Sequence, residues 1–187
     1  AVALPDIEYI INNSEGSPHY TGIAKILKAY TLAQAVDIWG DVPSSEALKG
    51  TANTQPKLDN DEEVYNQIFA MLDEGLTGIK AASSNSSPGP NETIYKGDRA
   101  KWEKFANTLK LRLYLHYSEK DPGFAKSKMD ALIASGAPFM ASNADNFEMT
   151  FVDATSSQNP IHQFEVSRLN YTFPNKFLVD MMNTKAD

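Results

Sequence analysis

The chain of 187 residues contains no cysteine. Disulfides, thiolate metal sites and cysteine nucleophiles are therefore excluded. It also lacks an apolar run of about 18 residues, the length that a bilayer-spanning helix requires. Histidine is scarce, and His19, His116 and His162 lie far apart and outside any HExxH unit. The hydrophobic content of 42% is ordinary for a globular protein, so we expect a folded core rather than disorder.

Basic residues are fewer than acidic ones. The chain has 17 Lys and Arg against 24 Asp and Glu, a net charge of −7. A surface that binds nucleic acid needs clustered cations to displace counterions, so we expect no nucleic acid partner. One stretch, residues 96–121, is basic, with seven basic and four acidic side chains. It lies on a predicted helix and is either a solvated face or a patch for phosphate or an acidic partner.

Apolar residues recur at helical spacing along most of the chain. Helices are predicted over residues 22–39, 59–79, 98–113 and 121–136, with a last one after Pro174. Residues 83–91 and 153–163 predict loops, and the alternation over 146–151 predicts a strand. The fold class is therefore expected to be mainly α, with tetratricopeptide-like antiparallel helix pairs, irregular loops and a little β-strand near the C-terminal part.

Three aspartates are expected to cap these helices. Asp59 has Glu62 three residues later as a capping-box partner, Asp98 precedes the third helix, and Asp121 is followed by Pro122 at the first helical position. Within the second helix, Gly75 and Gly78 each cost about 1 kcal/mol relative to alanine. Their presence indicates either a weak helix or a place where another helix comes close.

No catalytic constellation emerges from the sequence. There is no GxSxG elbow, no phosphate-binding loop and no GxGxxG motif. The acidic cluster Asp59, Asp61, Glu62 and Glu63 is read as a helix N-terminus, where carboxylates are favoured, rather than as a calcium site. We therefore expect a protein that is not an enzyme and that holds no metal and no cofactor.

The segment Trp39-Gly40-Asp41-Val42-Pro43 is the most distinctive in the chain. An indole at a helix end, followed by a carboxylate in a turn, suits a sugar ring, which stacks on the aromatic face while polar groups hold its hydroxyls. The alternative is a core tryptophan that closes the helix, with Asp41 satisfying turn amides. Tyr171 follows Arg168 and Asn170, a second mixture of ring, cation and amide. Trp39, Asp41 and Tyr171 are the predicted ligand-binding residues.

Three ordered blocks resemble the SusD/RagB family. Residues 22–48 end in Asp-Ile-Trp-Gly-Asp-Val-Pro-Ser-Ser-Glu-Ala-Leu, and residues 57–74 contain Val-Tyr-Asn-Gln-Ile. Residues 95–112 begin with Tyr-Lys-Gly-Asp and, two residues later, continue as Lys-Trp-Glu-Lys-Phe-Ala-Asn-Thr-Leu-Lys-Leu-Arg. The end of the chain, from Phe177, resembles the approach to the family's Asn-Asp-Pro-Arg segment. Family members are much longer, so the chain resembles a central fragment: one helical domain over residues 1–187, with an irregular ligand-binding part that begins near 137 and is cut at 187.

The resemblance implies an outer-membrane nutrient-binding protein, surface-exposed and lipid-anchored in its full-length form. Such proteins deliver an oligosaccharide or another nutrient to a SusC-type TonB-dependent transporter and are not enzymes. The signal peptide and lipidated cysteine of the family are not in this sequence. One alternative stays open: a helical-repeat module that binds a protein or peptide partner without glycan contact.

Overall fold

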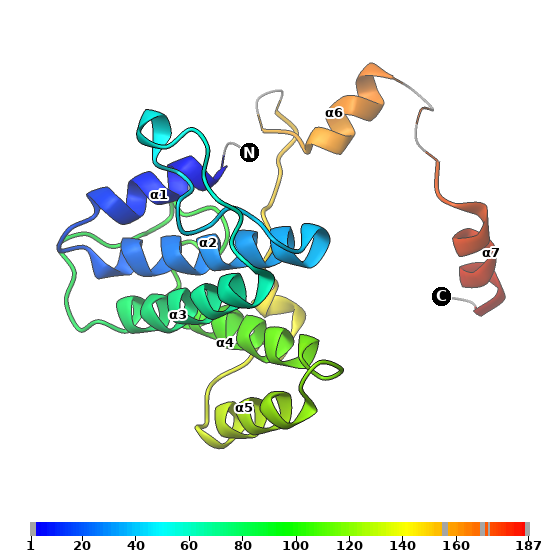
Figure 1. Cartoon of the computed structure of the whole chain (residues 1–187). Helices are drawn as coiled ribbons and strands as arrows, with labels where there is room; N and C mark the ends of the chain where they lie inside the picture. Colours follow the sequence, from blue (N-terminus) through cyan, green and yellow to red (C-terminus); the bar gives the residue numbers. More distant parts are fainter. Residues whose placement is uncertain (1–2, 155–156, 169–170, 172, 186–187) are drawn as a thin grey trace. The chain divides into compact units, whose positions relative to one another are not determined.

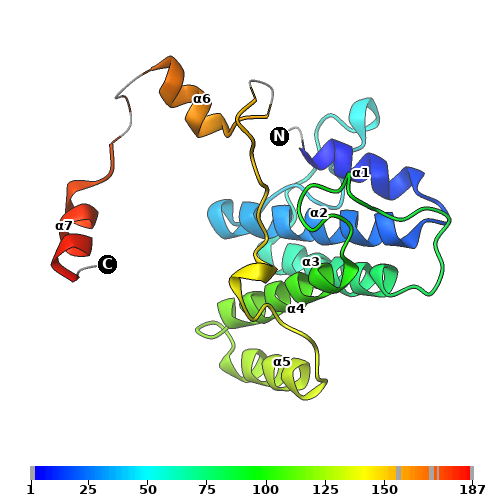
Figure 2. The same cartoon turned by 180° about the vertical axis from the view of Figure 1, so that it is seen from behind.

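The computed structural model describes residues 3–154, 157–168, 171 and 173–185. They form two units, residues 1–148 and 149–187. The first unit contains the helices drawn in Figures 1 and 2 as α1 (Ala3–Asn13), α2 (Pro18–Trp39), α3 (Asp61–Ile79), α4 (Arg99–His116) and α5 (Pro122–Ala134). The second unit contains α6 (Pro160–Ser167) and α7 (Lys176–Lys185). Two short 3₁₀ turns, Gly50–Ala52 and Asn143–Asp145, belong to the first unit. The predicted mainly α, tetratricopeptide-like fold is confirmed.

Helices α2 and α3 form the closest pair of the first unit and lie side by side in both views. Their backbones approach at Gly22, Gly75 and Gly78. A Cβ added to Gly22 would lie 2.8 Å from the Gly75 carbonyl oxygen and 2.8 Å from the Ile79 nitrogen. The glycines of α3 therefore mark close helix contact, which was one of the two readings of the sequence.

The core lies between α2, α3 and α4. The apolar stripe of α4 is buried throughout: Trp102, Phe105, Ala106, Leu109 and Leu113. The apolar stripe of α3 is buried except at Leu76, which is half-buried, and it consists of Val64, Ile68, Leu72, Leu76 and Ile79. Aromatic rings close one side of this core, where Phe147 stacks on Phe105 with a centroid distance of 4.1 Å. The amphipathic periodicity thus packs three helices on one another.

Two of the three predicted caps are confirmed. Asp98 accepts hydrogen bonds from the Ala100 and Lys101 amides, and Asp121 accepts one from the Phe124 amide at 2.9 Å. The third is wrong, because Asn60 caps α3 through the Glu62 amide at 3.1 Å. Asp59 lies one residue before this cap and is buried, and its carboxylate accepts hydrogen bonds from the preceding loop instead.

Three further expectations need correction. The strand predicted over 146–151 does not form: these residues are irregular, and among the described residues the only β-type pairing is an isolated bridge between Val42 and Asp59. Without a neighbouring strand, alternation cannot create a ladder, and Phe147 alone uses it to reach the core. Helix α1 was not anticipated, and α6 begins inside the predicted loop 153–163. The final helix is confirmed as α7, whereas a domain boundary near 137 stays a prediction.

Candidate ligand-binding site

Trp39 is the last residue of α2 and its side chain is 72% exposed. The helix ends there because Gly40 adopts a positive φ of 71°, while the Gly40 amide still donates to the Val36 carbonyl at 2.9 Å. Glycine reaches this conformation without a steric penalty. The indole therefore projects from a rigid helix end, and the core position considered for Trp39 is not the one that it occupies in this structure.

Asp41 follows in the turn and is also exposed. Its Oδ1 accepts a hydrogen bond from the Asp61 amide at 3.0 Å. That amide belongs to the first residue of α3, where backbone donors lack partners within the helix. Asp41 thus joins the turn after α2 to the start of α3, which agrees with a role in satisfying turn amides and also keeps the turn in place beneath Trp39.

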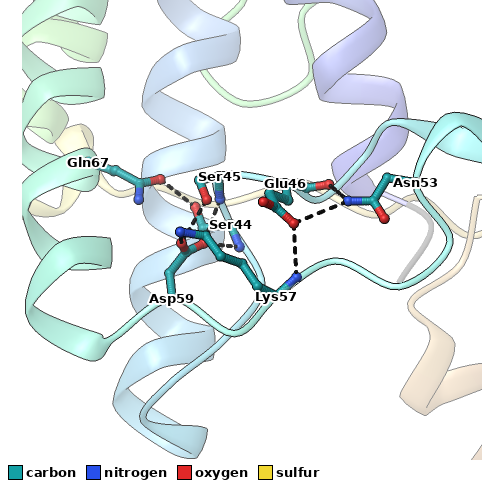
Figure 3. A network of polar contacts seen from close by, with 7 residues as sticks. All are labelled: Ser44, Ser45, Glu46, Asn53, Lys57, Asp59 and Gln67. Atoms are coloured by element: carbon teal, nitrogen blue, oxygen red, sulfur yellow. Dashed lines mark hydrogen bonds and ion pairs between the residues drawn. The ribbon is translucent and has the colours of Figure 1, made fainter.

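The base of the loop between α2 and α3 is a polar network around the buried Asp59, drawn in Figure 3. Asp59, only 2% exposed, accepts hydrogen bonds from the Ser45 hydroxyl at 2.7 Å and from the Ser45 and Ser44 amides at 2.7 and 2.9 Å. Lys57 Nζ lies 3.3 Å from its Oδ1. The Ser45 hydrogen bonds, foremost, hold the pKa of Asp59 well below its usual range. A carboxylate that is ionised at neutral pH therefore secures the loop.

The third predicted ligand residue, Tyr171, belongs to the second unit and is 68% exposed. Its ring meets Phe164 edge-on, with centroids 5.3 Å apart, and the Arg168 guanidinium lies over both rings. Leu169, Asn170 and Thr172 of the predicted motif lie outside the described residues. Trp39 and Asp41 are brought together at one turn, whereas Tyr171 forms a separate aromatic cluster in its own unit.

Sequence reasoning missed a cleft of about 580 Å³ in the first unit, where the C-terminal ends of α2 and α4 meet the start of α3. Its centre is a hydrogen-bonded chain of three side chains: Tyr65 donates to Asp37, and His116 Nδ1 lies 2.9 Å from the Tyr65 hydroxyl. Burial, followed by the Asp37 hydrogen bond, raises the pKa of Tyr65, which stays protonated. The sequence alone indicates no role for His116 beyond its place outside any HExxH unit. Since its partners lie on two other helices, no local motif could have indicated this chain.

Neither a metal centre nor a membrane span is found in the part of the chain that the structure describes. No group of three or more His, Asp or Glu side chains there could hold a metal ion. No described helix is both long enough and apolar enough to cross a bilayer.

Comparison with known proteins identifies the family. A family model described as "Starch-binding associating with outer membrane" matches residues 2–187. A solved chitin-binding protein is 30% identical with a TM-score of 0.81, over 98% of this chain and 39% of that chain. A chitin-binding SusD homolog from Flavobacterium johnsoniae is 28% identical with a TM-score of 0.74, over 88% of this chain and 34% of its own.

A SusD homolog from Bacteroides uniformis is likewise 28% identical, with a TM-score of 0.75, over 90% of this chain and 34% of its own. The chain thus spans between a third and two fifths of the length of these solved relatives. No curated protein matches. The resemblance drawn from the three sequence blocks is confirmed, because the family model spans nearly the whole chain: it belongs to the SusD-like family.

Proposed function

We propose that this chain is part of an outer-membrane protein that binds a glycan, and that the turn Trp39–Asp41 contributes to the site. The observation that carries the proposal is the exposed indole of Trp39 at the end of α2. Tryptophan is highly buried on average, so an exposed ring held on a rigid helix end needs an explanation. A sugar ring supplies one, because its apolar face stacks on the indole while its hydroxyls meet polar groups nearby.

The relatives favour this reading over a module that binds only protein. Two solved relatives of similar fold are chitin-binding proteins, and the family is described as starch-binding. We therefore propose an oligosaccharide ligand, with chito-oligosaccharides as the first candidates. Delivery to a SusC-type TonB-dependent transporter, surface exposure and a lipid anchor in the full-length protein complete the proposal, and they rest on the family alone.

Tryptophan fluorescence gives a direct test. The chain has two tryptophans, and Trp102 is fully buried whereas Trp39 is 72% exposed. A glycan that stacks on Trp39 should shift the emission to shorter wavelength, and Trp39→Ala should abolish both the shift and most of the binding. Chitohexaose is the first probe and maltohexaose the second.

The matched control is Ile38→Ala, because Ile38 is the preceding residue, is 67% exposed and carries no ring. This variant should bind like the parent chain. Titration of Tyr171→Ala tests the second unit in the same way. If neither glycan binds, or if Trp39→Ala binds as tightly as the parent, the proposed site is wrong.

We further propose that the glycan is bound and not cleaved. The two carboxylates of the turn and loop that follow Trp39 have structural partners: Asp41 holds the start of α3, and Asp59 holds the loop. A glycosidase needs two carboxyl groups facing one sugar bond. Incubation with either hexaose should release no reducing ends. Release that a single Asp or Glu substitution abolishes would overturn this part of the proposal.

A further inference from the structure

In the cleft between α2, α3 and α4, basic and acidic side chains come from different helices. Its basic side chains, Arg112, His116 and Lys120, come from α4 and the turn that follows it. Its carboxylates come from the end of α2 and the first turn of α3, and they are Asp37, Asp61 and Glu62. One wall is therefore basic and the opposite wall acidic.

Two contacts already join these walls. Lys120 Nζ lies 3.3 Å from Glu62 Oε2, and His116 Nδ1 lies 3.4 Å from Asp37 Oδ1. Arg112 and Asp61 have no ion pair with any residue in the described part of the chain. Asp61 uses Oδ1 only for the Glu62 amide at 2.6 Å. Each wall thus keeps one charged side chain that makes no direct ion pair, although the charge of Asp61 also acts on Lys120 across the cleft.

Two tyrosine rings line the cleft between its basic and acidic walls. Tyr65 and Tyr117 meet edge-on with centroids 5.5 Å apart. The Tyr65 hydroxyl donates its only proton to Asp37, so His116 Nδ1–H donates to the hydroxyl oxygen, and the three side chains fix one another. Burial raises the pKa of both tyrosines, which stay neutral. The cleft is therefore preorganised, and its volume of about 580 Å³ suits a small molecule.

We propose that this cleft binds a small zwitterionic ligand, with its carboxylate on Arg112 and its ammonium on Asp61. A guanidinium pairs with a carboxylate through two parallel hydrogen bonds, and a carboxylate accepts from an ammonium, so both unpaired side chains gain a charge-assisted partner. A ligand with only one charge pairs with either Arg112 or Asp61 and leaves the other side chain without a partner. The cleft adjoins the Trp39 turn, because the Asp61 amide donates to Asp41, but neither Trp39 nor Asp41 lines it, and the proposal does not depend on the glycan proposal.

Glycylglycine is the probe, because it carries both charges on a short backbone. Its binding to the ¹⁵N-labelled chain is followed by amide chemical shifts, which detect millimolar affinities. N-acetylglycylglycine lacks the ammonium, and glycylglycine amide lacks the carboxylate. We expect saturable shifts at residues of the cleft with glycylglycine, and binding weakened about tenfold or more by either blocked analogue, since each loses a charge-assisted pair.

The variants Arg112→Gln and Asp61→Asn should each weaken glycylglycine binding to a similar extent. Arg112→Gln should also make the chain indifferent to the loss of the ligand carboxylate. Lys126→Gln is the control, because Lys126 is an exposed lysine of α5 whose partner is Asp130, outside the cleft. Trp39→Ala should leave glycylglycine binding unchanged, which separates this test from that of the glycan site.

Equal binding of the blocked analogues would overturn the proposal, as would shifts that map outside the cleft. Shifts at the cleft with chitobiose but not with glycylglycine would show a sugar site instead. If either variant does not fold, the comparison of the three probes on the unaltered chain still decides the question.

Discussion

The close contact of α2 and α3 makes a specific prediction for Gly22→Ala. The new Cβ would lie 2.8 Å from the Gly75 carbonyl oxygen, 2.8 Å from the Ile79 nitrogen and 3.0 Å from the Ile79 Cγ2. The first two are backbone atoms, so no rotamer change can relieve the overlap. The helices must move apart along the line where Gly22, Gly75 and Gly78 meet.

The magnitude follows from two opposing terms. In an open helix interior, glycine to alanine stabilises by about 1 kcal/mol. Overpacking a closely packed contact costs about 1–3 kcal/mol, and backbone overlap belongs at the upper end. We expect a net loss of about 1–2 kcal/mol. For a chain of this size that lowers the thermal midpoint by roughly 2–8 °C.

The assay is thermal and urea unfolding followed by far-UV circular dichroism, with Gly123→Ala as the control. Gly123 lies in α5, and its added Cβ would meet only Asp121 Oδ1 at 3.5 Å. The same substitution there should leave stability unchanged or raise it by up to about 1 kcal/mol. If Gly22→Ala is as stable as the parent chain or as Gly123→Ala, the close helix approach described above is wrong.

Three further substitutions test the caps, the loop and the exposed indole. Asp121→Ala should destabilise the chain by about 1 kcal/mol in urea unfolding, because the Phe124 amide loses its acceptor; an unchanged midpoint would contradict the cap. Asp59 has a lowered pKa in the folded state, so its stabilisation is complete above the unfolded pKa of about 4 and is lost as the pH falls below it. Asp59→Asn should therefore lose less stability than the parent between about pH 5 and pH 3, and a parallel loss would refute the linkage. Trp39→Ala should change stability by no more than about 0.5 kcal/mol, as an exposed side chain does; a loss of about 3–5 kcal/mol would place the indole in a core.

Local features of the fold could be predicted from the sequence because their causes lie within a few residues. Asp98 and Asp121 cap helices through amides two or three positions away. Asp59 shows where this reasoning ends. Its acidic side chain suited a cap equally well. The amides of Ser44 and Ser45, some fifteen residues earlier, donate to its carboxylate instead. The neighbouring Asn60 then takes the cap.

The candidate sites divide in the same way. Trp39 and Asp41 belong to one short turn, so the pentapeptide already pointed to them, although only the structure distinguishes an exposed indole from a buried one. The cleft had no such signal. Tyr65 is 28 residues from Asp37 and 51 from His116, and the chain that they form exists only because three helices pack with those ends together. Spacing within one helix cannot reveal it.

The polar network around Asp59 also affects how far the sequence and length of the loop between α2 and α3 can change in evolution. Its two ends are joined by the Val42–Asp59 bridge and by the Ser45 hydrogen bonds, so the intervening residues contribute little to holding the helices together. Doubling the length of a closed loop costs only about 0.6 kcal/mol. The exposed tip around residues 50–55 is therefore a place where insertions, epitope grafts or new recognition sequences could accumulate while the helix pair beneath stays intact.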